Sequence, residues 1–177
     1  MALQLVNLDE RTRTFMGEEL QWDIDNGALY ISNRLTDAGR VRWPGALREA
    51  IDQGDDASLA AELHSPGYLN TTEQRRKPSG GFSTAQGPAT APETLAEGEF
   101  NRFYIRGVCR RAIADTMPTV VVYRAKAVER PRTESEAKIG KQVDAQRLLD
   151  DLHTSQGIDT ALGLPAGPNS GLSIRLP

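Results

Sequence analysis

Apolar side chains recur every three or four residues along much of this chain, which is the spacing that one face of an α-helix requires. The first such stretch follows Asp9, a residue type suited to a helix N-cap, and carries Met16 and Leu20 on one side. Gly27 stands where a helix end favours glycine. The pattern therefore predicts a helix between Asp9 and Asn26.

Two shorter amphipathic stretches come next. Pro44 suits the first turn of a helix whose apolar positions include Leu47, and Gly54 can end it. Asp55 or Asp56 can then cap a second short helix. Because the connection between them is short, the two helices are expected to form a hairpin.

The strongest helical pattern opens at Pro92 and runs to about Asp115, with apolar side chains over a broad surface. A strand is predicted over residues 119–128. Its first half is β-branched or aromatic on both faces, and such a strand belongs inside a sheet. Asp144 can cap a final helix, which Gly157 follows.

Two stretches lose this periodicity. Residues 65–92 are rich in Gly and Pro and poor in large apolar residues, and the chain from 158 onward is also rich in Gly and Pro. Fixing such segments costs ~1 to 2 kcal/mol per residue in backbone entropy, so contacts with another subunit are the natural source of order. We therefore divide the chain into an acidic helical N-terminal part (1–64), an arm or linker (65–92), a helix–strand–helix core (93–157) and an extended tail (158–177).

Together these elements predict a helix-dominated single α+β domain with a small sheet, a long central helix, and an extended arm and C-terminal tail. The 177 residues, 38% hydrophobic and 25% charged, suit one globular domain. No apolar run approaches the ~18 to 20 residues of a membrane span, and the chain does not open on a basic region followed by an apolar signal segment. We expect a cytoplasmic or virion location and no membrane partner.

Charge divides the chain into three blocks. Residues 1–73 hold 6 basic and 13 acidic residues, residues 74–141 hold 13 basic and 7 acidic, and residues 142–177 hold 2 basic and 4 acidic. The formal net charge of -3 hides this asymmetry. The first two blocks can attract each other inside one chain or across a subunit interface, or the basic block can face a polyanion.

The basic block contains a stripe of like charge. Arg102, Arg106 and Arg110 recur every fourth residue of the long predicted helix, a spacing that costs a few tenths of a kcal/mol per pair. A phosphate backbone or an acidic partner surface would offset this cost through forked hydrogen bonds. The alternative is a solvated helix face balanced by acidic residues. The candidate polyanion- or partner-binding residues are Arg75, Arg76, Lys77, Arg102, Arg106, Arg110, Arg124 and Lys126.

Signals for catalysis or metal binding are weak. Glu136 and Lys138 loosely follow the Glu-x-Lys pattern of metal-dependent nucleases, but they lie in a polar stretch outside the predicted strand. His64 and His153 each lie near a predicted helix end, where the helix dipole favours histidine. Cys109, the only cysteine, lies among apolar residues and is expected to be buried and inert. No cofactor or metal site is predicted.

The leading functional hypothesis is a non-catalytic structural or assembly protein of a larger complex, such as a virion component, which forms homo- or hetero-oligomers through its arm and tail. The alternative is a nucleic-acid-binding or processing protein that uses the basic central block. A metal-dependent nuclease comes third, and an enzyme is the less expected class.

Overall fold

The computed structural model describes residues 2–76, 78–155 and 170–177. Helices dominate these residues and two small sheets accompany them, which confirms the predicted helix-dominated α+β domain. Among the described residues, no helix combines the length and the apolar character that crossing a membrane requires. In chain order the elements are α1 (Glu10–Asp25), α2 (Asp37–Gln53), α3 (Asp56–Leu63), β1 (Thr72–Arg76), β2 (Phe82–Gln86), α4 (Ala91–Ala114), β3 (Thr119–Arg124), α5 (Thr133–Glu136), β4 (Gln142–Asp144), α6 (Ala145–Thr154) and β5 (Leu172–Arg175).

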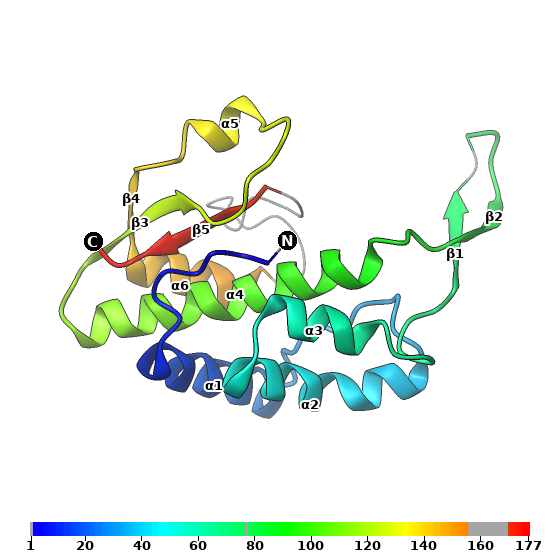
Figure 1. The fold of residues 1–177 in the computed structure, drawn as a ribbon, viewed down its shortest axis with the longest axis horizontal. Coiled ribbons are helices and arrows are strands. Elements are labelled where there is room, and N and C mark those ends of the chain that lie inside the picture. Colours follow the sequence, from blue (N-terminus) through cyan, green and yellow to red (C-terminus); the bar gives the residue numbers. More distant parts are fainter. Residues whose placement is uncertain (1, 77, 156–169) are drawn as a thin grey trace.

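α4 is the long central helix that the sequence predicts (Figure 1). α1 and α3 pack along one side of it, while α6 and the sheet that contains β3 lie along the other. Phe100, Tyr104 and Val108 are fully buried along its length. The predicted burial of Cys109 is confirmed, because this part of α4 is covered from both sides.

α1 begins and ends where the sequence predicts. The side chain of Asp9 accepts a hydrogen bond of 3.0 Å from the backbone N–H of Thr12, and Gly27 adopts a left-handed φ of +62° just past the helix. α1 lies close against α4 at Gly107, where a Cβ atom would stand 2.6 Å from Cγ of Met16. This glycine therefore sets how closely the two helices approach.

α2 differs from its prediction because it starts at Asp37, which places Pro44 inside the helix and not in its first turn. Thr36 caps the helix by accepting a hydrogen bond of 2.9 Å from the backbone N–H of Gly39. A proline inside a helix removes one backbone hydrogen bond. The neighbouring Trp43 is fully buried, so packing of this face outweighs that loss.

The predicted strand is β3, which lies in the middle of a three-stranded antiparallel sheet with the order β4-β3-β5. It ends at Arg124, earlier than the predicted residue 128. Val120 and Val122 are buried on one face, against the helices. The central position agrees with the apolar composition of its first half.

The predicted outward-reaching tail is wrong for the residues of β5. This strand pairs with β3, and its Leu172 and Ile174 are fully buried. Leu172, Ile174 and Leu176 alternate with polar residues, a pattern typical of a strand, but the Gly- and Pro-rich composition of the stretch favoured the prediction of an extended tail. The remainder of the predicted tail, residues 158–169, lies outside the described residues.

The arm region 65–92 also differs from its prediction, since β1 and β2 form an antiparallel hairpin there. Its tip carries Gly80 and Gly81, which adopt left-handed φ values of +90° and +78°. Apart from Phe82 and Ala85 the two strands are polar, so the apolar–polar alternation that marks a half-buried strand is missing from the sequence.

Candidate functional site

The hairpin of β1 and β2, which we call the hairpin arm (residues 72–86), extends away from the helices (Figure 1). Thr72 lies opposite Gln86 at its base, and Arg76 lies opposite Phe82 near its tip. Within the described residues, the two strands pair with each other and with no other strand. Phe82 is 69% exposed, which is unusual for a residue with so large an apolar side chain.

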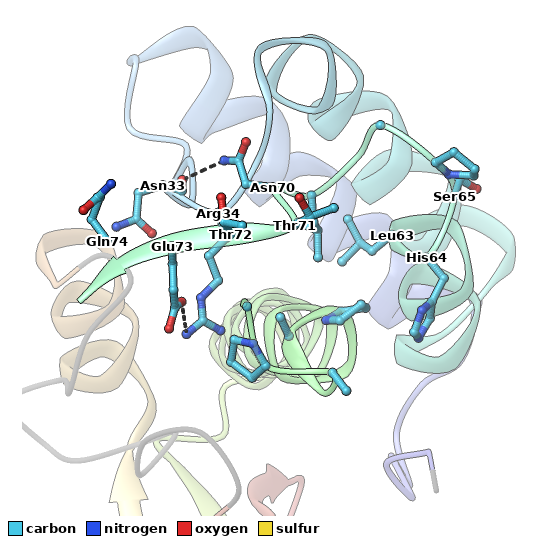
Figure 2. A pocket seen from close by; sticks show the side chains of 18 residues that line it. Asn33, Arg34, Leu63, His64, Ser65, Asn70, Thr71, Thr72, Glu73 and Gln74 are labelled. Carbon is cyan, nitrogen blue, oxygen red and sulfur yellow. Dashed lines mark hydrogen bonds and ion pairs between the residues drawn. The ribbon is translucent and has the colours of Figure 1, made fainter. Parts of the chain in front are cut away.

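A cleft of about 670 Å³ lies where the hairpin arm leaves the body, and we call it the root cleft. Figure 2 shows the labelled side chains that surround it, which come from the chain before α2, the end of α3 and the start of β1. The return of the chain from β2 into α4 completes its wall. Its polar or charged side chains include Asn33, Arg34, His64, Asn70, Thr71, Thr72, Glu73 and Gln74.

One wall of the root cleft fixes the arm to the body. The guanidinium group of Arg34 lies 3.5 Å from the carboxylate of Glu73 at the start of β1 (Figure 2). The backbone N–H of Asn70 donates a 2.8 Å hydrogen bond to the carbonyl of Arg34, and its side chain donates another to the carbonyl of Leu35. Leu35 itself is buried in the hydrophobic core, so these hydrogen bonds attach the root to a residue that the core holds in place.

The opposite wall carries His64, whose Nε2 lies 2.8 Å from Oε1 of Glu93 at the start of α4. This hydrogen bond lowers the pKa of the Glu93 carboxyl below its usual value. Arg34 and His64 thus each face a carboxylate of the same chain. Exposed pairs of this kind add little stability, and Oε2 of Glu93 is buried without a hydrogen-bond partner among the described residues, so the hydrogen bonds of Asn70 are the firmer attachment of the root.

The predicted arginine stripe lies largely inside the fold. Arg106 is only 1% exposed, and its guanidinium group donates hydrogen bonds of 2.7 Å to Glu19 and of 2.8 and 2.9 Å to Asp23, both on α1. Burial alone would raise the pKa of Glu19, but hydrogen bonds and charges from His153 and Arg106 outweigh it and lower the pKa to about 2. Arg106 is therefore occupied by two carboxylates of its own chain.

The other two arginines of the stripe also bind their own chain. Arg110 donates hydrogen bonds of 2.8 Å to Glu19 and 2.9 Å to Glu18, and it remains partly exposed. Arg102 donates to the carbonyl groups of Leu152 and Ser155 at the end of α6. The acidic N-terminal block thus neutralises Arg106 and Arg110 within one chain, which was one of the alternatives that the charge pattern left open.

Two further predicted cations secure the sheet. Arg124 forms an ion pair with Glu136 of α5, and Lys126 forms one with Glu97 of α4. Glu136, the acidic residue of the nuclease-like pattern, is therefore the partner of an arginine. The residues that the structure describes include no group of three or more His, Cys, Asp or Glu side chains that could hold a metal ion.

Two of the three consecutive basic residues at positions 75–77 lie on the hairpin arm. Arg75 and Arg76 belong to β1, and Arg76 is exposed; Lys77 lies outside the described residues. The seven predicted residues that the structure describes therefore occupy three separate places: the arm, the helix contacts of α4, and the end of β3. They do not converge on a single basic surface.

Sequence reasoning missed the cluster around His153. Its Nε2 lies 2.6 Å from Glu19, and its ring stacks on Trp22 with the centroids 4.4 Å apart. The sequence carries a signal for the neighbouring carboxylate–arginine contact but none for His153, because Glu19 and Asp23 are four residues apart on α1, as are the arginines on α4. Two helices with matched four-residue spacing of opposite charges can pair face to face.

Comparison with protein-family models, curated protein sequences and solved structures finds no match to this chain.

Proposed function

We propose that this protein is a non-catalytic assembly component that joins a larger complex through its hairpin arm. One observation carries the proposal: the arm extends from an anchored root and its strands pair with no other strand of the described residues. A cytoplasmic or virion particle is the setting that we propose for such a component.

The hairpin arm lacks the support that a two-stranded sheet usually needs. Isolated hairpins are marginal in water, and independent stability needs three or more strands with a hydrophobic face, or packing against a helix. Phe82 contributes the arm's largest apolar side chain, and it is exposed. A neighbouring molecule that covered this side chain would bury apolar surface, and one that paired with a strand of the arm would extend the sheet.

The distribution of charge supports the same conclusion. Arg102 and Arg106 are buried and bind groups of their own chain, so they offer little to a partner. Arg76, by contrast, projects from the arm. Arg76 is therefore available to a partner, whereas Arg102 and Arg106 are not.

The test measures the mass of the full chain by sedimentation velocity and light scattering over a wide concentration range. The matched variant replaces residues 72–86 with a short Gly/Ser linker, which leaves the root and the helices in place. We expect the native chain to form oligomers and the variant to be monomeric with an unchanged helical circular dichroism signal. A native chain that stays monomeric at every concentration, with an arm that proteases cut readily, would overturn the proposal.

Nucleic-acid binding is the second candidate, and the observation that favours it is the run of three basic residues, 75–77, on the arm. The test is salt-dependent binding of the full chain to single- and double-stranded DNA and RNA. The triple variant R75A/R76A/K77A should lose this binding, whereas the control R130A/R132A, which removes two exposed arginines elsewhere, should retain it. Equal loss in both, or no salt-dependent binding, excludes this candidate.

A further inference from the structure

β2 is a sheet edge without the usual protection. One side of β2 pairs with β1 over five successive residues, and its other side faces no other strand of the described residues. Natural edge strands are protected by charged residues, proline or bulges. The sequence of β2, Phe82–Gln86, contains no charged residue and no proline, and its register with β1 is continuous. β1, on the opposite edge, carries Glu73, Arg75 and Arg76.

We infer that the β2 edge binds the β2 edge of a second copy of this chain, in an antiparallel pair with Thr84 on the two-fold axis. This inference rests on the proposed function and names the partner of the arm. Because β2 is uncharged, this register places no like charges opposite one another. It sets Thr84 against the partner's Thr84 and Phe82 against the partner's Gln86, and Thr–Thr pairs across strands are favourable.

The pairing would also cover part of the exposed face of the arm. Successive side chains of a strand alternate between its faces, so Phe82, Thr84 and Gln86 share one face, which is the more exposed one. In the two-fold pair, Gln86 and Thr84 of the partner subunit lie beside Phe82 on this face and cover part of it. Two hairpins become one four-stranded sheet, in which each β2 strand gains a second strand neighbour and the exposed Phe82 side chain gains cross-strand contacts.

An isologous contact of this kind closes on itself and produces a dimer and not an open fibre. A peptide strand from another protein could bind the same edge, but its register would not place two copies of residue 84 together. The position of Thr84 therefore distinguishes the inferred partner from other occupants.

Disulfide formation gives the first test. Cys109 is buried and burial raises the pKa of its thiol, so the variant T84C has one accessible thiol. Opposed residues of an antiparallel pair have Cα atoms about 4.5 to 5.5 Å apart, which a disulfide can span. We expect mild oxidation of T84C to give a covalent dimer that retains the native circular dichroism spectrum.

The control is Q74C, because Gln74 lies directly opposite Thr84 in the same hairpin and its side chain donates a 3.1 Å hydrogen bond to the Thr84 hydroxyl. It exposes a thiol on the same face but on the other edge, so it should remain monomeric under the same oxidation. Cross-linking of Q74C as fast as T84C, or no cross-linking of T84C, would overturn the inference.

Charge exchange gives a second, non-covalent test. T84K and T84E should each weaken dimerisation roughly fivefold, because two like charges then face each other across the axis. An equimolar mixture of the two variants should restore native affinity. A mixture no tighter than the single variants overturns the inference.

The outcomes for the arm as a whole are separable. If replacement of the arm abolishes assembly while T84C fails to cross-link and the charge variants behave as the native chain, the arm binds something else; the inference then fails and the proposed function stands. If the arm can be replaced with no effect on assembly, both fail.

Discussion

Arg106 donates two hydrogen bonds, of 2.8 and 2.9 Å, to the two carboxylate oxygens of Asp23, and both residues are buried. This forked pair joins the centre of α4 to the last turns of α1. Glu19, one helical turn earlier on α1, accepts a hydrogen bond of 2.7 Å from Nε of the same guanidinium group, and its backbone carbonyl accepts one of 3.3 Å from Nη2. The contact between the two helices thus has a charged centre inside an apolar interface.

Removal of Arg106 should be strongly destabilising. R106A leaves Glu19 and Asp23 buried without their main counter-charge, which costs about 3 to 5 kcal/mol of unfolding free energy. Urea denaturation followed by circular dichroism measures the change. R130A, at an exposed site, serves as the control and should alter stability by less than about 0.5 kcal/mol. A loss below about 1 kcal/mol for R106A would contradict the burial of this pair.

Glu99 should make stability depend on pH in the range above its ordinary pKa. Burial raises the pKa of this carboxyl to about 7, despite the opposing charge of Arg102. Because the folded state holds the proton more tightly than the unfolded state, the contribution of Glu99 is full below about pH 4.5 and declines as the pH rises toward 7. E99Q should therefore unfold at higher urea concentration than the native chain at pH 8, and the gap should close by pH 4. A gap that is equal at both pH values would exclude this titration.

Thr116 offers a stabilising substitution. It is the one described non-glycine residue with a positive φ, +58°, and it follows the end of α4. The backbone N–H of Met117 bonds to the carbonyl of Ala112 there, a helix ending that favours glycine in this position. T116G should raise the melting temperature, with a gain of about 1 kcal/mol, because glycine relieves the strain of a β-branched residue. T116A keeps a Cβ atom, so its melting temperature should rise much less. Equal rises for T116G and T116A would show that the positive φ is not the cause of the stabilisation.

Two glycines of α4 should respond in opposite ways to alanine. At Gly107 a new Cβ atom meets Met16 Cγ at 2.6 Å and the Thr12 carbonyl at 3.0 Å, so G107A should destabilise by about 1 to 3 kcal/mol. At Gly98 nothing lies within 4 Å, so G98A should stabilise through helix propensity by about 0.5 to 1 kcal/mol. Thermal unfolding of the pair measures both. A stabilised G107A would show that α1 and α4 are further apart than described.

Local signals in the sequence predicted much of the fold. Asp9, Asp55 and Asp144 cap helices as expected, because an N-cap depends only on a side chain and a backbone N–H three residues away. The apolar surface of α4 was equally visible, since it follows the helical period. The predicted start of α2 was wrong, because it relied on the preference of proline for the first turn of a helix. The burial of Trp43, which outweighs that preference, is a contact with distant parts of the chain.

The candidate site was less predictable, since it depends on which elements meet. Arginines at four-residue spacing look the same whether they face solvent or the carboxylates of Glu19 and Asp23, so the interior position of Arg106 could not be read from α4 alone. The hairpin arm was missed for a different reason. Its strands bury little, so the sequence carries no apolar alternation, and only Gly80 and Gly81 at the tip point to a turn.

The pairing of β5 with β3 has a consequence for the order of events during synthesis. Val122 lies beside Ile174, so the middle strand of the sheet lacks one neighbour until a segment translated much later has left the ribosome. Until then the helices can gather around α4, but one flank of the nascent molecule stays open to solvent and to chaperones. Closure of that flank by β5 completes the sheet and buries Leu172 and Ile174.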